Sequence, residues 1–395
     1  SPVFMRYRLL SPKIWVESIG SGGGSIAWID ADTGLLKVGP RGAGASPGPV
    51  CYQRGGTEPT VTDADLVLGY LNDGYFLGGQ MRLDRAAAEE AISEKIARPL
   101  GMSATEAASA ISRIVNSQMS DLIRNATIRR GDDPRNDVLF AFGGAGPVHA
   151  SRFAAELGIR EVVVPATASV HGAVGLVASD VVYEEGATDR MEVPVETDRI
   201  NDAFAPLLDK VRAELADAGF KQEDTLMIRS VAMKYRYQVH ELTVPFPPGA
   251  ELLTEEDLKS LYQRFDDTYE EMYGKGSAYR AAGQEIATLR VRGVGLLPKP
   301  RIESISAREE AATPGPAADG AWKGQRDVYF EERKGFIPTD IYDYAELTAG
   351  GTIEGPAVIE TPITTVVVNP GDRAVLDEYA NLRIAIGAGP GQEAP

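Results

Sequence analysis

Two glycine-rich turns are the segments of this chain whose residue types and spacing favour ligand chemistry. The first is Gly20-Ser-Gly-Gly-Gly-Ser25 and the second is Gly143-Gly-Ala-Gly-Pro147, and an apolar run of strand length precedes each. Successive backbone N–H groups in such a turn can form an anion-binding nest, and glycine lets the backbone approach a ligand closely. The turns predict a phosphate or adenosine site, although plain close-packed turns have the same composition. The candidate binding residues are Gly22, Gly23, Gly24, Ser25, Gly143, Gly144, Ala145 and Gly146.

The second turn lies within a pattern that is typical of one β-α-β unit. Residues 138–142 form an apolar run, which we expect to be a buried strand, and a helical pattern runs from Pro147 to about Leu157. A second apolar strand follows at residues 161–164. Open α/β sheets bind ligands at the carboxyl ends of their strands, and a helix N-terminus favours negative charge. The unit therefore predicts a nucleotide site at this edge, although the chain has neither a Walker-type Gly-Lys-Ser/Thr sequence nor the dinucleotide fingerprint.

Histidine, the side chain that acid–base catalysis uses most often, is scarce, because the chain has three histidines. His149 lies in the first turn of the predicted helix, where it either reaches a bound phosphate or packs against the fold. His171 follows a predicted strand on a loop, which allows a ligand-facing position. His240 lies in an alternating segment and is expected to be a surface or core residue of a strand. His149 and His171 are therefore catalytic candidates.

The acidic residues supply one further candidate. Asp63 and Asp65 lie at the start of a short predicted helix. A carboxylate near phosphates can hold Mg²⁺ there, and N-capping explains both residues equally well. Asp63 is therefore a catalytic candidate too. The chain has no His-x-x-x-His or His-Glu-x-x-His spacing and Cys51 is its single cysteine, so we predict no metal-binding residues.

The composition is that of a packed, acidic protein and limits its partners. The 395 residues carry a formal net charge of −17, and 43% of them are hydrophobic. Nucleic acid and anionic membrane surfaces need clustered Lys and Arg, so neither is an expected partner. One cysteine allows no intrachain disulfide, and no apolar run approaches the roughly 20 residues of a membrane span. We expect a cytoplasmic protein. Because the chain begins at Ser1 rather than Met, we also expect a fragment whose earlier part is missing.

Periodicity divides the chain into helical and strand-rich segments. An Asp-Thr-Gly turn at residues 32–34 predicts a hairpin between two short strands. Apolar residues at helical spacing occur at residues 66–71, 86–96, 103–128, 202–218 and 255–273. Alternating or continuous apolar runs predict strands at residues 226–245, 285–295, 357–359 and 365–368. The composition shifts near residues 183–186, and residues 306–320 are rich in Ala, Glu, Pro and Gly, as in a linker or exposed loop.

Several of these segments, taken in order, resemble the hydantoinase A / 5-oxoprolinase family, which includes the ATP-binding subunits of acetone and acetophenone carboxylases. The resemblance covers nearly the whole chain. The matching motifs are residues 18–28, 39–49, 55–65, 130–135, 142–149, 273–276 and 355–360.

The resemblance implies an α/β fold that contains part of an actin-like ATPase domain, of the type found in hexokinase and actin. That portion is expected at residues 1–186, with a helical insertion at about residues 60–135. An α+β domain at residues 187–303, a linker at residues 304–326 and a β-rich C-terminal domain at residues 327–395 are expected to follow. In this fold the glycine turn at Gly143 to Gly146 contacts adenosine.

ATP and Mg²⁺ are the cofactors that the resemblance implies. Two family motifs that hold the phosphates and the metal, Asp-Val-Gly-Gly-Thr and Asp-Met-Gly-Gly-Thr-Ser-Thr-Asp, do not occur in this sequence. Both would lie upstream of Ser1, so the metal ligands are expected there.

The implied function is that of an ATP-dependent activating subunit of a ketone carboxylase. Such a subunit phosphorylates a carbonyl substrate or bicarbonate for carboxylation to a 3-oxo acid, in a hetero-oligomer with a hydantoinase B-type partner. Residues 127–131, 238–242 and 273–279 resemble the ketone carboxylases more than the ring-opening enzymes. One alternative is an ATP-dependent hydantoinase, 5-oxoprolinase or lactamase that opens a cyclic amide. A second is a non-catalytic scaffold subunit that lacks the phosphate loops.

Overall fold

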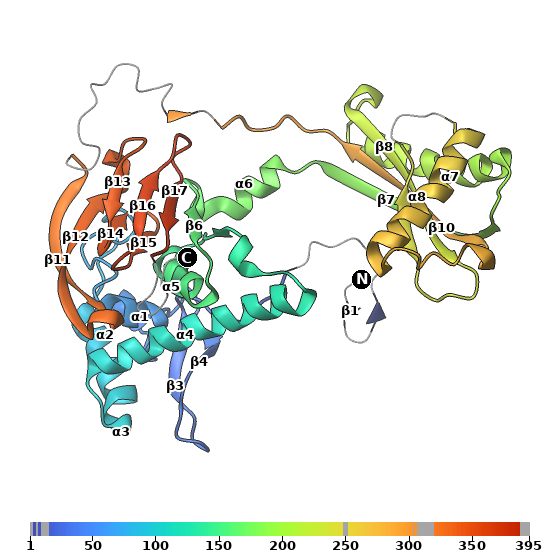
Figure 1. Ribbon diagram of the computed structural model, residues 1–395. Helices are drawn as coiled ribbons and strands as arrows, with labels where there is room; N and C mark the ends of the chain where they lie inside the picture. The colour runs from blue at the N-terminus through green and yellow to red at the C-terminus, as the bar shows by residue number, and fades with distance from the viewer. Residues whose placement is uncertain are drawn as a thin grey trace. The chain divides into compact units, whose positions relative to one another are not determined.

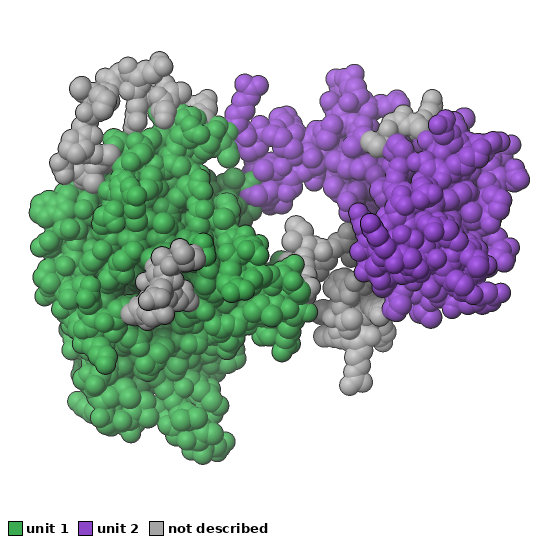
Figure 2. Space-filling view, in the orientation of Figure 1, with its two compact units in different colours: residues 1–174, 302–395 green, residues 175–301 purple. Residues whose placement is uncertain are grey.

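The computed structural model describes residues 16–247, 252–302, 304–305 and 320–387, and the backbone of residues 3–4 and 7–8. The chain divides into two compact units. Unit 1 comprises residues 1–174 and 302–395, and unit 2 comprises residues 175–301 (Figure 2). Unit 1 therefore combines the first and last parts of the sequence, and it contains both glycine turns.

A five-stranded sheet joins these two parts of the chain in unit 1. Its strand order is β13-β16-β17-β6-β5. The strands are β5 (Leu139–Phe140), β6 (Glu161–Val164), β13 (Thr352–Glu354), β16 (Arg373–Leu376) and β17 (Leu382–Ala385). We expected residues 327–395 to form a domain of their own. The antiparallel pairing of β17 with β6 instead places these strands in the same sheet and the same compact unit.

A four-stranded sheet in unit 1 has the order β11-β12-β14-β15. Its strands are β11 (Trp322–Phe330), β12 (Gly335–Asp343), β14 (Ala357–Glu360) and β15 (Thr365–Val368). All of β14 and most of β15 are buried. A strand that is covered on both faces needs apolar residues throughout, which explains the continuous apolar runs in this part of the sequence. Most of the expected linker, residues 306–319, lies outside the described residues, and β11 begins in its last part.

Helices pack against these sheets in unit 1 (Figure 1). They are α1 (Val61–Val67), α2 (Arg85–Ile92), α3 (Arg98–Leu100), α4 (Ala104–Thr127) and α5 (Gly146–Leu157). A capping box fixes the start of α4, because Ser103 Oγ accepts the Glu106 N–H while the Glu106 carboxylate accepts the Ser103 N–H. Helix α5 contacts both α4 and β15.

Two antiparallel strand pairs complete the described part of unit 1. The predicted hairpin is confirmed as β3 (Ser25–Ile29) and β4 (Leu36–Gly42). A second pair consists of β1 (Val3–Phe4) and β2 (Tyr7–Arg8). The hairpin follows directly on the first glycine turn, so β3 fixes the position of that turn.

The predicted β-α-β unit is present, but its first strand is not the buried strand that we expected. β5 and β6 pair in parallel, with α5 between them in sequence. However, β5 is two residues long and forms the edge of its sheet. Val138, Phe140 and Phe142 are 46%, 55% and 51% exposed. Because these side chains alternate along the chain, they lie on the same face of the strand. Among the described residues, none covers this face fully.

Unit 2 is an antiparallel sheet with two long helices. The sheet order is β7-β10-β8-β9, formed by β7 (Val181–Glu192), β8 (Thr225–Tyr235), β9 (Leu242–Pro245) and β10 (Gln284–Gly295). The helices are α7 (Thr197–Asp217) and α8 (Glu255–Tyr273), and α8 has the predicted bounds. Phe204, Tyr235 and Phe265 are fully buried in the core that joins helices and sheet. His240 is exposed between β8 and β9 rather than in a strand, because the chain turns after Tyr235.

The predicted mixed α/β class is confirmed by these sheets and helices. The finer assignment to an actin-like ATPase fold stays a prediction. Helix α6 (His171–Ala178) spans the residue boundary between the two units. In the part of the chain that the structure describes, no helix is both long and apolar enough to cross a membrane.

A buried carboxyl group, Asp372, lies in the turn between β15 and β16. Its residue is 5% exposed, and its Oδ1 accepts the Gly387 N–H at 2.9 Å. Burial raises the pKa of Asp372 to about 6, although the hydrogen bonds from Gly387 and Asn369 act in the opposite direction. The folded protein therefore binds a proton here over a pH range in which the unfolded chain has already lost it.

This pKa predicts that stability falls as the pH rises from about 4 to about 7. The raised pKa favours the folded state at low pH, and we expect a loss of about 2 kcal/mol across this range. Asp372→Asn removes the ionisation while its amide oxygen can still accept the Gly387 N–H. The variant should melt at a higher temperature than the wild type at pH 7.5, and the difference should shrink toward pH 4. Exposed Glu378→Gln is the control, and a pH-independent difference for Asp372→Asn would contradict the prediction.

Candidate functional site

The two glycine turns meet in the folded chain, although about 120 residues separate them. A Cβ added at Gly23 would lie 2.8 Å from Thr62 Oγ1 and 3.4 Å from the Cβ of Ala145. Thr62, near the start of α1, donates its N–H and its hydroxyl to the Gly23 carbonyl, each at 2.8 Å. A Cβ at position 23 would displace the Thr62 hydroxyl, so glycine at this position lets the first turn pack closely against α1.

The hydrogen bonding of the turns leaves several backbone N–H groups free. Thr364 donates to the Gly144 carbonyl at 2.8 Å, and the Gly23 and Gly24 carbonyls accept from Thr62 and Ala43. In contrast, the N–H groups of Gly23, Gly24, Gly144 and Ala145 make no hydrogen bond to any described residue. Helix α5 also begins here, and its N-terminus has no side-chain cap. Free N–H groups from two turns beside a helix N-terminus form an environment suited to an anion.

A cavity of about 360 Å³, here called the glycine cavity, lies on one side of these turns. Its walls combine backbone from both turns with mostly apolar side chains, among them Val115, Met119, Phe142 and Phe153. His149 and Asn116 are its polar side chains from helices α5 and α4. The cavity thus contains Gly22, Gly23, Gly143, Gly144, Ala145 and Gly146 of the predicted binding residues.

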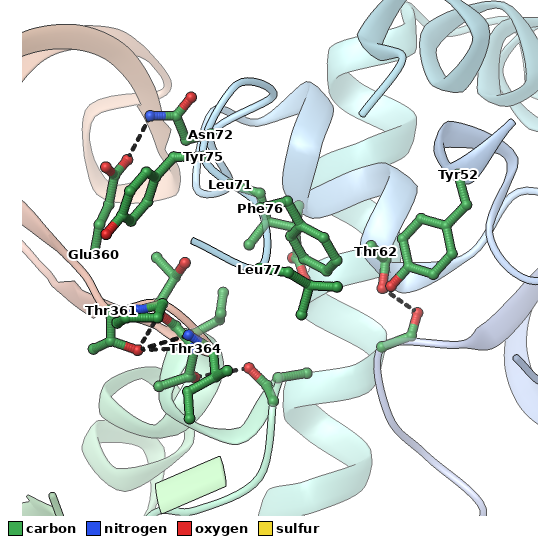
Figure 3. Close-up of a pocket in the computed structure, with 18 of the residues that line it drawn as sticks. Tyr52, Thr62, Leu71, Asn72, Tyr75, Phe76, Leu77, Glu360, Thr361 and Thr364 are labelled. Carbon is green, nitrogen blue, oxygen red and sulfur yellow. Dashed lines mark hydrogen bonds between the residues drawn. The ribbon is translucent and has the colours of Figure 1, made fainter. Parts of the chain in front are cut away.

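A second cavity of about 220 Å³, here called the aromatic cavity, adjoins the first at lining residues that the two cavities share. Gly23, Gly144 and Ala145 line both cavities. Tyr52, Tyr75 and Phe76 give the second cavity its aromatic character, and Figure 3 shows Phe76 and Leu77 between Tyr52 and Glu360 in this view. This cavity was not predicted from the sequence. Much of its lining comes from loops at residues 71–77 and 361–364, where the sequence analysis found no motif.

Asp65 and His149 approach each other at the boundary of the two cavities. Asp65 lines the aromatic cavity and His149 lines the glycine cavity. His149 Nε2 lies 3.3 Å from Asp65 Oδ2, and the residues are 7% and 1% exposed. Asp65 Oδ1 and His149 Nε2 have no hydrogen-bond partner among the described residues. Burying unsatisfied polar atoms costs free energy, so this pair is suited to bind a ligand group rather than to stabilise the fold.

The other candidates from the sequence have structural contacts. The Asp63 carboxylate accepts hydrogen bonds from Thr60, Val50 and Cys51, and it completes the capping box of α1. Of the two interpretations of Asp63, the structure supports capping. Ser25 Oγ accepts the Gly22 N–H at 2.9 Å and thereby closes its own turn.

His171 lies near the glycine cavity without lining it. Its ring centroid is 5.2 Å from that of Phe142, and its Nδ1 is 2.9 Å from Thr167 Oγ1. It therefore contacts a wall residue of the cavity. Among the described residues there is no group of three His, Cys, Asp or Glu side chains placed to hold a metal ion.

Glu360, at the end of β14, anchors the loop that covers the aromatic cavity. This residue is 1% exposed. Its carboxylate accepts hydrogen bonds from Arg326 and Lys323 at 2.7 Å and from Asn72 at 2.9 Å. Burial alone would raise the pKa of Glu360, but these three hydrogen bonds together lower it. The charged Glu360 therefore connects Asn72 to the C-terminal sheet.

The fold and the site first define a class, namely mixed α/β proteins with a glycine turn that follows a strand at its carboxyl end, where such folds bind ligands. The family models give a more specific assignment than this class. Residues 2–185 match the Hydantoinase/oxoprolinase family model, and residues 187–385 match the Hydantoinase/oxoprolinase C-terminal domain model. The chain therefore belongs to the hydantoinase/oxoprolinase family, as its ordered motifs predicted.

Similar proteins of this family include enzymes of two kinds. The chain is 36% identical to the gamma subunit of acetophenone carboxylase from Aromatoleum aromaticum, covering 96% of this chain and 52% of that subunit. It matches a nucleotide-free structure of acetone carboxylase, from work on ATP-dependent acetone carboxylation, with a TM-score of 0.82 and 30% identity, over 94% of this chain and 52% of that one. It also matches the ATP-dependent caprolactamase of Pseudomonas jessenii with a TM-score of 0.76 and 37% identity, over 98% and 55%. The chain thus spans about half the length of these relatives.

The anchoring role of Glu360 predicts a stability effect. Glu360→Ala leaves the half-buried Lys323 and Arg326 cations without their carboxylate, and we expect the free energy of unfolding to fall by about 2–3 kcal/mol. Urea denaturation measures this change. Glu354→Ala is the matched control, because its partner Arg373 is exposed and such pairs contribute less than about 1 kcal/mol. Equal effects of the two substitutions would contradict the anchoring role.

Proposed function

We propose that this chain is the ATP-binding part of a hydantoinase A-type activating enzyme, which transfers a phosphoryl group from ATP to a carbonyl oxygen. The observation that carries the proposal is the meeting of two glycine turns with free N–H groups at the wall between two cavities. The ATP dependence named for similar caprolactamase and acetone carboxylase structures supports it.

The glycine cavity has the features that a nucleotide requires. Its apolar walls suit an adenine base, and the free N–H groups suit a phosphate. A Cβ added at Gly22, Gly24, Gly144 or Gly146 would meet no atom within 4 Å. The missing side chains therefore leave open space beside the turns, into which a ligand can fit closely. This supports the assignment of Gly143 to Gly146 to the adenosine side of the site.

Mg²⁺ is the metal that phosphoryl transfer from ATP ordinarily uses. The described residues do not form a site for it, because the Asp63 carboxylate is occupied by four hydrogen bonds and no cluster of ligands is present in the described chain. We therefore assign no step to the metal, and its predicted ligands remain those of the two family motifs that this sequence lacks.

Two reactions can follow the proposed phosphoryl transfer. Joining a phosphorylated ketone to bicarbonate gives a 3-oxo acid, and attack of water on a phosphorylated cyclic amide opens its ring. Relatives of both kinds have nearly the same identity to this chain, at 36% and 37%, so similarity does not separate them. The similar proteins are named as subunits, which supports a hetero-oligomer with a hydantoinase B-type partner.

An ATPase assay on the full-length protein assembled with its partner subunit tests this function. Stimulation by a ketone, with labelled bicarbonate incorporated into product, identifies a carboxylase. Stimulation by a cyclic amide, with ring opening and no incorporation, identifies a hydrolase. Absence of ATP hydrolysis with both classes of compound would exclude both reactions and favour a scaffold subunit.

The glycine cavity also predicts the effect of a substitution on nucleotide affinity. Gly144→Val places a side chain into open space beside the free N–H groups, so it should weaken ADP and ATP binding at least 10-fold with little change in melting temperature. Calorimetric titration of the full-length protein measures the affinity. Gly172→Val, at a position that is also open and lines neither cavity, is the matched control. Unchanged affinity in Gly144→Val would exclude the glycine cavity as the nucleotide site.

A further inference from the structure

Asn116 is a buried polar residue in the lining of the glycine cavity. We propose that its carboxamide selects the base of the nucleotide, by hydrogen bonding to the 6-amino group of adenine and to a ring nitrogen beside that group. Asn116 then makes the site prefer an adenine nucleotide to one without the amino group. The inference rests on the proposed function, because it concerns the base of the nucleotide assigned to this cavity.

The position of Asn116 on the buried face of α4 has no structural explanation in the described part of the chain. Asn116 is 3% exposed, and its Oδ1 has no hydrogen-bond partner among the described residues. By contrast, Ser120 on the same face donates its hydroxyl to Glu156 at 2.7 Å. A buried polar group without a partner costs free energy that a ligand can recover by supplying one. An asparagine at this position therefore points to a ligand.

The other polar side chains in the lining of the glycine cavity already lie beside a possible partner. Ser21 Oγ donates to Gln118 Oε1 at 3.3 Å, and His149 Nε2 lies 3.3 Å from Asp65 Oδ2. The Asn116 carboxamide makes no hydrogen bond to any residue that the structure describes. Among the described side chains of this cavity, it is thus the group that depends most on a ligand.

The chemistry of a carboxamide matches the 6-amino group of adenine and its surroundings. A carboxamide carries an acceptor oxygen beside donor N–H groups, and a half-turn of the side chain exchanges their positions. Adenine has an acceptor nitrogen on each side of its 6-amino group, so an asparagine can form two parallel hydrogen bonds with it, as in the recognition of adenine in DNA. Guanine carries an oxygen in place of this amino group, and next to N7 it offers two acceptors and no donor. Asn116 therefore favours adenine.

The walls beside Asn116 suit the faces of a purine. Val115 and Met119 lie next to it on α4, and Phe142 and Phe153 line the same cavity. Aromatic rings and thioether groups pack well against a planar ring system. Away from water, a hydrogen bond is stronger and an unpaired polar group is more costly. A base bound between these apolar side chains is therefore discriminated by whether its edge satisfies Asn116.

A nucleotide that lacks the 6-amino group tests the proposal directly. ADP is compared with purine riboside 5′-diphosphate, in which hydrogen replaces this group, and with GDP, by calorimetric titration of the full-length protein. We expect ADP to bind at least 10-fold more tightly than either, because sites that hydrogen-bond an N–H group discriminate against analogues without it. Equal affinity of ADP and purine riboside diphosphate, or of ADP and GDP, would overturn the proposal.

Asn116→Leu tests whether Asn116 is the source of this preference. Leucine has a similar volume and no polar atom, so the variant should bind ADP at least 10-fold more weakly and purine riboside diphosphate within about 3-fold of the wild type. The melting temperature should not fall, because the substitution removes an unpartnered buried group. Ser120→Ala, on the same face of α4 but outside both cavities, is the matched control and should keep the wild-type preference.

A purely structural role of Asn116 would give a different result. Both affinities would then fall together in Asn116→Leu, and their ratio would stay that of the wild type, which contradicts the proposal. Asn116→Ala gives the same comparison without a larger side chain if Asn116→Leu does not fold. The preference of the wild-type protein for ADP is measured independently of either variant.

The outcomes separate this inference from the proposed function. Protein that binds neither ADP nor purine riboside diphosphate contradicts the proposed function, and the inference with it. Protein that binds both with equal affinity contradicts the inference alone. A preference for ADP that survives in Asn116→Leu shows that another group recognises the base, and it excludes Asn116 as the selecting residue.

Discussion

The absence of a side chain at Gly23 is the constraint on which the rest of the site depends. A Cβ there would lie 2.8 Å from Thr62 Oγ1, and displacing this hydroxyl would break its hydrogen bond to the Gly23 carbonyl and loosen the first glycine turn from α1. The same contact sets the wall between the glycine cavity and the aromatic cavity. One close approach of backbone thus creates two neighbouring sites with different linings, and the free N–H groups lie where the two sites meet.

Contacts from the C-terminal part of the chain hold the second glycine turn and the loop at residues 71–77 in place. Thr364 binds the Gly144 carbonyl, which leaves the N–H side of the turn free for a ligand. Glu360, four residues earlier, gathers Asn72, Lys323 and Arg326 around one buried carboxylate. A buried charge of this kind is tolerated because all of its partners are present. Strands β14 and β15 therefore belong functionally to the site, not only to the core.

The two cavities differ in the charge and polarity of their linings. The glycine cavity offers backbone N–H groups and apolar walls, which suit phosphate and a base, while the aromatic cavity offers rings and two carboxylates. Asp65 and His149 lie at their boundary. In the proposed phosphoryl transfer the chain contributes mainly positioning and backbone N–H groups that stabilise charge. Such a reaction needs little from histidine, of which the chain has three.

The sequence by itself determined the local elements and the family. The Asp-Thr-Gly turn at residues 32–34 predicted the hairpin, and helical spacing predicted α8. Apolar runs on either side of a helical pattern predicted the β-α-β unit. The glycine turns and their ordered neighbours indicated the hydantoinase/oxoprolinase family. Only the tertiary structure decided that β17 joins β6, that β5 is an exposed edge strand, and that Asp65 rather than Asp63 carries the unsatisfied carboxylate oxygen. These features depend on contacts between residues far apart in the chain, whose pairing leaves no periodic signal in the sequence around them.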